Sequence, residues 1–168
     1  MAFIQVFVTI GWIFGKIPGT FKILDLSFKT LSLNNGCLIA RRWGTLFVFD
    51  MEDYTHRKVL LYCFERSEIS FLLRLVAQDK KVVDIGANVG FVSIPVAKAL
   101  LSGEVIAIEP VPSTYSQLKA NIDVNRLTNV SARNFAIGSR DGELILDNTV
   151  ETDDSSGFWR QVDALSST

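Results

Sequence analysis

The sequence predicts an α/β fold built around a parallel sheet, and three observations lead to this prediction. First, residues 81–85 form a short β-branched run of the kind found in strands that are buried on both faces. Second, a turn that contains glycines follows this run and leads into an apolar stretch with helical spacing. Third, another β-branched run follows at 105–108, so that the order strand, helix, strand gives a β–α–β unit.

The chain begins with an apolar run, residues 1–15, that contains no charged side chain. A membrane-spanning helix needs about 20 apolar residues, and Lys16 and Pro18 end the run before that length. The run also lacks the positive start and the cleavage site of a secretory signal. Three interpretations of residues 1–18 stay open: an element packed on the domain, an interfacial membrane anchor aided by Trp12 and Lys16, or an artefact of the assigned start site.

Residues 19–64 are predicted to form a β-rich extension that covers one edge of the main sheet. Two strand-like runs, 28–33 and 37–41, flank the sequence Asn34-Asn35-Gly36, which is typical of a hairpin turn. A second apolar pair, 45–49 and 58–64, lies on either side of the acidic loop 50–53. The sequence therefore predicts an N-terminal β-hairpin extension before the main domain, residues 65–168.

The main domain is predicted to alternate helices and strands. Residues 67–78 carry apolar side chains at helical spacing. The helix after the glycine turn is expected to start at 91–93, with Pro95 in its first turn, and to end near residue 101. Pro112 opens a further helix that ends near residue 126. Strands are expected at 130–137 and 143–147, and a polar loop at 147–156.

The glycine turn is the predicted ligand site, because ligands of parallel sheets bind beyond the carboxyl ends of the strands. Gly86 and Gly90 have no side chains that would keep a ligand from the backbone. Glu109 ends the second strand, close to the spacing of roughly 20 residues at which an acid accepts hydrogen bonds from ribose hydroxyls. The pattern predicts a ligand that contains adenosine.

Two classes of adenosine ligand fit this arrangement, a dinucleotide and S-adenosylmethionine. The dinucleotide pattern G-x-G-x-x-G needs a further glycine so that a pyrophosphate can approach the helix, and this chain has Asn88 there. The negative charge of Asp84 suits an ammonium and a sulfonium group. The sequence therefore favours S-adenosyl-L-methionine as the cofactor.

Three blocks of the sequence resemble the FkbM family of class I methyltransferases: D-I-G-A-N-V-G-F at 84–91, I-E-P-V-P-S-T-Y-S-Q-L-K-A-N at 108–121 and N-F-A-I-G-S-R-D-G-E-L at 134–144. The resemblance extends from about residue 43 to about residue 146. It implies a Rossmann-like class I methyltransferase fold and methyl transfer to a hydroxyl of a sugar or secondary metabolite. The family's K-I-D-x-E-G block does not occur before Thr168, so the resemblance predicts an incomplete domain that lacks its C-terminal part.

The predicted cofactor site combines the glycine turn, the ends of the second and third parallel strands, and an upstream glutamate suggested by the resemblance. Its residues are Glu65, Asp84, Gly86, Ala87, Asn88, Gly90, Phe91, Glu109, Pro110, Asn134, Phe135 and Ala136. The turn is assigned to the methionine part, Asp84 to its ammonium, Glu109 to the ribose and residues 134–136 to the adenine. Phe135 as a core residue and Glu65 as a helix-start residue are the alternatives. No catalytic base and no metal site is assigned.

Composition and charge give the expected partners and location. The 17 basic and 18 acidic residues give a net charge of −1 without a basic stripe, which argues against a nucleic-acid partner. The expected partner is a small-molecule or glycan hydroxyl acceptor, the expected location is cytoplasmic, and residues 1–15 offer peripheral membrane contact. The second functional hypothesis is a non-catalytic or truncated module that binds S-adenosylmethionine or a membrane.

The remaining reactive side chains are expected to be structural. Cys37 and Cys63 have neither the spacing of a metal knuckle nor the number of a disulfide framework, so both are predicted to be buried thiols. The single histidine, His56, is a candidate general base, but an exposed loop position is the favoured interpretation because no partner can be named.

Overall fold

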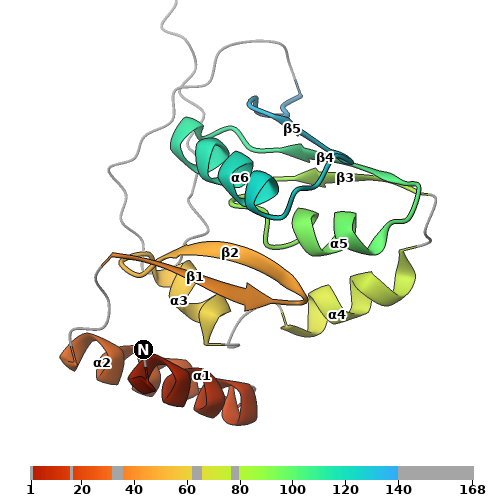
Figure 1. Ribbon diagram of the computed structural model, residues 1–168. Coiled ribbons are helices and arrows are strands. Elements are labelled where there is room, and N and C mark those ends of the chain that lie inside the picture. Colours follow the sequence, from red (N-terminus) through yellow and green to blue (C-terminus); the bar gives the residue numbers. More distant parts are fainter. Residues whose placement is uncertain (1, 16, 32–35, 62–65, 77–79, 140–168) are drawn as a thin grey trace, which may run out of the picture.

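A computed structural model describes residues 2–15, 17–31, 36–61, 66–76 and 80–139 of the chain (Figure 1). Its parallel sheet has the strand order β3-β4-β5, with β3 at Lys81–Ile85, β4 at Glu104–Ile108 and β5 at Val130–Arg133. The register pairs Asp84 with Ala107, and Ile108 with Arg133. The predicted α/β fold with β–α–β units is confirmed.

Helices α5 (Ser93–Ala99) and α6 (Pro112–Val124) connect the parallel strands and lie between the parallel sheet and the hairpin of β1 (Cys37–Arg42) and β2 (Thr45–Asp50) (Figure 1). Pro95 falls in the first turn of α5, where its missing N–H leaves no helical bond unmade, and Pro112 is the first residue of α6. Helix α4 (Arg66–Leu75), predicted at 67–78, packs beside α5.

The hairpin lies further along the chain than predicted. A strand was expected at 28–33, but residues 28–30 are the end of helix α2 (Thr20–Thr30). The hairpin turn falls at Trp43 and Gly44, whose φ angles are 47° and 80°. Two successive left-handed residues are typical of a two-residue hairpin turn. The error has a physical cause: Phe21, Leu24 and Phe28 recur at helical spacing and form the buried face of α2.

The prediction of a strand at 58–64 is also wrong for the residues that the structure describes. Residues Tyr54–Leu60 form helix α3 instead. Asp53 caps its start, since the Asp53 carboxylate accepts the His56 backbone N–H at 2.8 Å. The acidic loop therefore contained a helix-start signal that the strand prediction overlooked.

The apolar N-terminal run forms helix α1 (Ala2–Phe14), which packs on the rest of the protein. Phe7 meets Phe28 of α2 edge to face, with ring centroids 5.4 Å apart. Gly11 approaches the end of α3 so closely that a Cβ atom there would lie 1.9 Å from the Leu61 carbonyl oxygen. The packed element is therefore the interpretation that the structure supports. None of the described helices has the length and apolar character needed to cross a membrane.

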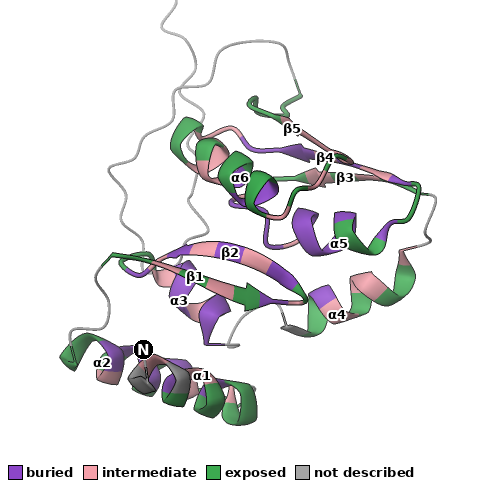
Figure 2. Ribbon diagram, viewed as in Figure 1, coloured by how far each residue is buried: buried purple, intermediate pink, exposed green. Residues whose placement is uncertain are grey.

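Strand β3 departs from the expected burial on both faces. Val83 and Ile85 are 55% and 63% exposed, whereas Val105 and Ala107 of β4 are buried. Figure 2 shows the same contrast between the two strands. Helices α5 and α6 cover one face of the sheet, and within the described residues nothing covers these two side chains on the other. Strand β5 ends earlier than predicted, and residues 143–156 lie outside the described part of the chain.

One apolar core joins the N-terminal helices, the hairpin and the parallel sheet. It includes Phe28 of α2, Phe49 of β2, Phe91 after the glycine turn and Leu118 of α6. The hairpin is therefore part of the same packed unit as the predicted ligand site.

Candidate functional site

The loop between β3 and α5 contains three residues with a left-handed backbone: φ is 78° at Gly86, 50° at Asn88 and 96° at Gly90. The two glycines are needed for different reasons. A Cβ atom at Gly86 would meet no atom within 4 Å, whereas one at Gly90 would lie 2.7 Å from Ile94 Cδ1 and 2.8 Å from Leu118 Cδ1. Gly86 thus leaves open space beside the loop, and Gly90 allows α5 and α6 to pack against it.

Each backbone N–H from residue 86 to residue 90 already has an acceptor within the protein. The bonds run from Gly86 and Ala87 to the Ile108 carbonyl (2.9 Å each), from Asn88 to Glu109 Oε2 (2.9 Å), from Val89 to Asn88 Oδ1 (2.6 Å) and from Gly90 to the Ala87 carbonyl (2.9 Å). A phosphate-binding loop presents free N–H groups to its anion. Because these five N–H groups are already used, the loop is poorly suited to a pyrophosphate, which agrees with the preference for S-adenosylmethionine over a dinucleotide.

Glu109 lies at the same loop, as its spacing suggested. It follows β4 directly and is 5% exposed. Its Oε2 accepts the Asn88 N–H and its Oε1 accepts the Val111 N–H, both at 2.9 Å. A carboxylate has about four acceptor positions, so these two bonds leave capacity for ribose hydroxyls. The structure therefore brings the glycine turn and the distant acid together.

Asp84 of β3 is held by the first residue of α5. The Ser93 hydroxyl donates to Asp84 Oδ2 at 2.5 Å. Burial raises the pKa of the Asp84 carboxyl above its ordinary value, and hydrogen bonds from Ser93 oppose part of that rise. A partly desolvated carboxylate gains free energy from a cationic neighbour, and an ammonium group is such a neighbour.

Residues 134–136 lie just beyond the end of β5, next to Glu109. The Asn134 side-chain amide donates to the Glu109 carbonyl at 2.8 Å and to the Pro110 carbonyl at 3.0 Å. Phe135 is 50% exposed, and Ala136 is also exposed. The alternative of Phe135 as a core residue is therefore wrong, and its ring is accessible at the edge where the strands end.

Ala87 and Phe91 point into the protein instead. Both are 4% exposed. The Phe91 ring stacks on that of Phe49, with centroids 5.8 Å apart, and lies edge to face with the His56 ring at 5.4 Å. These two side chains belong to the core beneath the loop, so their contribution to a cofactor site is through the backbone.

Four of the described side chains bond the outer edge of β2, and of these only His56 was a candidate in the sequence. There, Asn125 accepts the Leu46 N–H (2.8 Å) and donates to the Leu46 carbonyl (2.7 Å), Asn121 accepts the Val48 N–H (2.9 Å), Gln117 donates to the Val48 carbonyl (3.1 Å), and His56 Nδ1 accepts the Asp50 N–H (2.8 Å). The three amides recur at every fourth residue along α6 and its C-cap, Asn125, which places them on one face of the helix. That spacing was the available signal in the sequence.

His56 is not the exposed loop residue that we expected. It lies in α3 and is 3% exposed. Burial lowers the pKa of its imidazole, while the carboxylates of Asp53 and Asp50 oppose that shift. The neutral ring accepts a backbone N–H and supports Phe91, which is a structural role. The expectation failed because the helix cap at Asp53 was not recognised.

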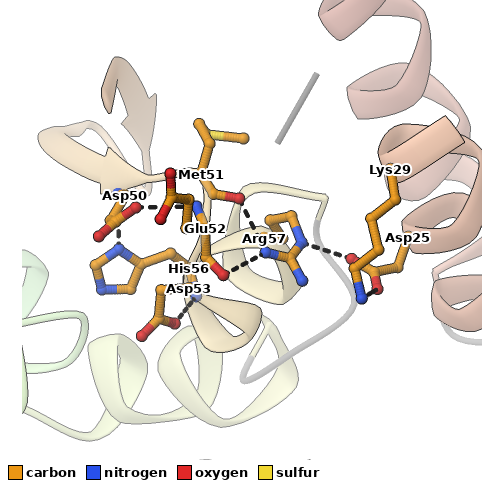
Figure 3. A network of polar contacts seen from close by, with 8 residues as sticks. All are labelled: Asp25, Lys29, Asp50, Met51, Glu52, Asp53, His56 and Arg57. Carbon is orange, nitrogen blue, oxygen red and sulfur yellow. Dashed lines mark hydrogen bonds and ion pairs between the residues drawn. The ribbon is translucent and has the colours of Figure 1, made fainter. Parts of the chain in front are cut away.

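A buried ion pair joins α2 to α3 (Figure 3). Arg57 Nε donates to Asp25 Oδ1 at 2.5 Å, and Arg57 Nη1 donates to the carbonyls of Met51 and Glu52 at 2.9 and 2.7 Å. Asp25 also pairs with Lys29 at 3.0 Å. Because Arg57 is buried, its guanidinium depends on Asp25 for charge compensation, whereas Asp25 has Lys29 as a second partner. This network anchors the N-terminal helices.

The remaining candidates have varied positions. Glu65 and Cys63 lie outside the described residues. Cys37 was expected to be buried and is exposed, since it stands at an outward position of the alternating pattern of β1. Across the described ranges, no group of three or more His, Cys, Asp or Glu side chains could hold a metal ion.

Comparison with known proteins identifies related sequences. The family described as TRM5/TYW2 methyltransferase domain matches residues 38–148, more than half of the chain. The tRNA(Phe) (4-demethylwyosine(37)-C(7)) aminocarboxypropyltransferase of Methanocaldococcus jannaschii is 33% identical over 92 residues, which are 55% of this chain and 35% of that protein. Methyltransferase 1 of Beauveria bassiana is 25% identical over 93 residues, which are 51% of this chain and 37% of that protein.

Solved structures show the same relationship. The structure of M. jannaschii TYW2 in complex with AdoMet is 30% identical, with a TM-score of 0.50 over 60% of this chain and 43% of that one. P. horikoshii TYW2 in complex with MeSAdo, at 22% identity and a TM-score of 0.51, covers 71% of this chain and 48% of that one and supports the fold alone. The chain spans about a third of the length of the curated relatives that it matches.

These findings correct two expectations. The resemblance to the FkbM family is overturned, because the family that matches is the TRM5/TYW2 one. The blocks at 84–91 and 108–121 encode the turn, strand end and helix of a β–α–β unit, which say more about the fold than about the family. The expected small-molecule acceptor and the absence of a nucleic-acid partner are contradicted by a relative named for tRNA(Phe). Net charge averages over the whole chain and does not report on one acceptor surface.

Three other expectations are supported. The Rossmann-like class I methyltransferase fold and the enzyme class agree with the matched family, and S-adenosylmethionine as cofactor agrees with the TYW2 structure that contains it. The family match over residues 38–148 leads to one conclusion: the chain belongs to the TRM5/TYW2 methyltransferase domain family.

Proposed function

We propose that this chain forms the donor-binding part of an S-adenosylmethionine-dependent methyltransferase that acts on tRNA. The observation that carries the donor site is the bond between Glu109 and the Asn88 N–H, which puts a carboxylate at the glycine turn. The family supports the reaction class. The 33% identical relative, which is named for tRNA(Phe), supports the acceptor. The predicted cytoplasmic location is part of this proposal.

In this proposal each part of the donor has its own contact. Gly86 leaves room for the methionine part, and Asp84 faces its ammonium directly or through water. Glu109 accepts hydrogen bonds from the ribose, and the exposed Phe135 lies near the adenine with its neighbours Asn134 and Ala136. The donor-binding region is assigned to residues 65–168, and the described parts of α2 and of the hairpin share its apolar core.

The protein's contribution to the chemistry is mainly one of position. S-adenosylmethionine supplies a methyl group that its sulfonium already activates. The acceptor atom forms a bond to the methyl carbon as the carbon–sulfur bond breaks, and the acceptor then loses a proton. The loop N–H groups are bonded internally at residues 86–90, so the loop is shaped before a ligand arrives and loses little conformational freedom on binding.

A second candidate is transfer of the donor's aminocarboxypropyl group to tRNA. One observation favours it: the 33% identical relative carries that activity in its name. The two reactions break different bonds to the same sulfur. Methyl transfer leaves S-adenosylhomocysteine, and aminocarboxypropyl transfer leaves methylthioadenosine, so the small product distinguishes them.

Calorimetry of the purified chain with S-adenosylhomocysteine tests the donor site, with NAD as the control for a dinucleotide. We expect S-adenosylhomocysteine to bind and NAD not to bind. Absence of binding by protein whose circular dichroism shows that it is folded would overturn the donor site.

Incubation with S-adenosylmethionine and unmodified tRNA transcripts, followed by mass spectrometry of the nucleosides, tests the acceptor. A methylated nucleoside supports the proposal, and a nucleoside that gains an aminocarboxypropyl group supports the second candidate. Donor binding with no modified tRNA would overturn the proposed activity of this chain in favour of a non-catalytic donor-binding module.

A further inference from the structure

Asn121 of α6 bonds two distant segments at once. Its side chain is fully buried, with 0% of the residue exposed. Its Oδ1 accepts the Val48 N–H of β2 at 2.9 Å, and its Nδ2 donates to the Val89 carbonyl of the glycine turn, also at 2.9 Å. One amide therefore connects the outer edge of the hairpin to the candidate donor loop.

The peptide between Val89 and Gly90 is held from both sides. Asn121 holds its carbonyl, and the Ala87 carbonyl accepts its N–H at 2.9 Å. A glycine has little steric preference for one sign of φ, so Gly90, at φ 96°, does not by itself fix how this peptide is turned. The two hydrogen bonds supply the constraint that the glycine lacks.

The neighbouring amide on α6 provides a contrast. Asn125 bonds the same edge of β2, accepting the Leu46 N–H and donating to the Leu46 carbonyl. Its other described bond goes to the Asn121 carbonyl within the helix. Asn125 therefore helps to dock the hairpin, and its described bonds do not include the loop.

We propose that Asn121 is a positioning residue for the donor site, which sets the Val89–Gly90 peptide and makes the shape of the loop depend on a docked hairpin. The inference rests on the proposed function, because it concerns how the same donor is bound. In this arrangement β1 and β2 are required for donor binding although they contribute no contact to the donor.

The variants Asn121→Asp and Asn125→Asp test the proposal. Each keeps the shape of the side chain and the oxygen that accepts from β2, and each loses its N–H donor. We expect Asn121→Asp to raise the Kd for S-adenosylhomocysteine about tenfold at neutral pH, the effect of one lost hydrogen bond, and Asn125→Asp to change it by less than about twofold. Equal changes in the two variants, or none in Asn121→Asp, would overturn the proposal.

The pH dependence of binding adds a second readout, in which Asn125→Asp controls for the destabilisation that a new carboxylate causes when it ionises. A protonated aspartic acid has an O–H donor, so the affinity of Asn121→Asp should recover towards that of the wild type as the pH falls. Burial shifts the pKa values of Asp84 and His56. These two groups and the Glu109 carboxylate are present in the wild type and in both variants, so the wild-type profile corrects for them. If the affinity deficit of Asn121→Asp stays constant or grows at low pH, the proposed role of the Asn121 side-chain N–H is contradicted.

Hydrogen exchange in the wild type tests the coupling even if Asn121→Asp fails to fold. The Val48 and Gly90 amides should open in the same unit, with the same dependence on low concentrations of denaturant. Rapid local exchange of Gly90 while Val48 stays protected would overturn the coupling. Failure of the wild type to bind S-adenosylhomocysteine would instead reject the proposed function, so the two failures are distinguishable.

Discussion

The Glu109 carboxylate accepts the backbone N–H of Asn88 at 2.9 Å and thereby ties the end of β4 to the turn that follows β3. The two residues follow neighbouring parallel strands, whose carboxyl ends meet at one edge of the sheet. The same carboxylate is thus a structural tie and the proposed ribose acceptor. The two roles can be separated by choosing the ligand.

Glu109→Gln should weaken binding of S-adenosylhomocysteine by about tenfold or more, because hydrogen bonds to a charged acceptor contribute about 1.5–3 kcal/mol. Calorimetry measures the change. Glu104→Gln is the matched control, since Glu104 lies at the opposite end of β4 and should leave the affinity unchanged. If Glu109 binds the ribose, Glu109→Gln should weaken binding of a 2′-deoxy analogue less than binding of S-adenosylhomocysteine. An equal decrease in affinity for both ligands would mean that Glu109 has only the structural role.

Gly86→Ala and Gly90→Ala should fail in different ways. A Cβ atom at position 86 meets no atom within 4 Å, so Gly86→Ala should lower the free energy of unfolding by only about 1 kcal/mol, because of the left-handed backbone. It should remove affinity for S-adenosylhomocysteine, because the methyl group fills the open space beside the loop. Alanine at 90 collides with Ile94 and Leu118 and should cost about 3 kcal/mol or more. Urea unfolding and calorimetry separate these effects. Full donor affinity in Gly86→Ala would show that the ligand lies elsewhere.

Asp84→Asn should stabilise the protein while weakening donor binding. Burial raises the pKa of Asp84, so this carboxyl favours folding below its unfolded pKa, and that contribution is lost as the pH rises through the folded pKa. At neutral pH an amide that still accepts from Ser93 removes this cost, a gain on the order of 1 kcal/mol. Thermal unfolding at neutral pH measures it, and the exposed Asp123→Asn is the control. A destabilised variant with unchanged affinity would contradict both expectations.

Asp25→Ala should destabilise the protein by about 3 kcal/mol or more, because it leaves the Arg57 guanidinium buried without its carboxylate. Lys29 is the other partner of Asp25, and the Lys29 side chain is 50% exposed. Lys29→Ala should therefore lower the free energy of unfolding by less than about 1 kcal/mol. Urea unfolding of both variants measures the difference. Similar costs would mean that the ion pair with Arg57 contributes no more than a surface pair.

Stability should fall as the pH decreases below the ordinary histidine value of 6.5, in part because of His56. Burial lowers its folded pKa, so the unfolded chain gains a proton first, and the stabilisation present above 6.5 is lost as the pH falls towards the folded pKa. His56→Asn should be less stable at about pH 7.5 and lose less stability between about pH 7.5 and pH 5.5. Urea midpoints at both values test this. Parallel profiles for variant and wild type would refute it.

The parallel sheet and the glycine turn were predictable because their signals are local. The β-branched runs before Gly86 and Glu109 follow one another in the chain, and parallel strands place their carboxyl ends together. Pro95 and Pro112 marked helix starts for the same local reason, since proline fits only the first turn. The sequence thus predicted both the turn and the acid that meets it.

The hairpin register and the amide contacts of α6 were not predictable in the same way. Asn121 and Asn125 bond strand residues that lie more than 70 positions earlier. Their four-residue spacing indicates a shared helix face but does not identify the strand that this face meets. The cap at Asp53 was local and was missed, which turned a helix into a strand and a buried histidine into an exposed one. The family, too, needed comparison with known proteins, because a β–α–β unit does not identify an acceptor.

The side chains along the outer edge of β2 also affect how the protein behaves in concentrated solution. An edge strand with free N–H and carbonyl groups is a template on which another molecule can add a strand, which is a common start of aggregation. Here Asn125, Asn121, Gln117 and His56 bond the outward groups of Leu46, Val48 and Asp50. The β2 edge of the hairpin is therefore closed to the addition of another strand at these three residues.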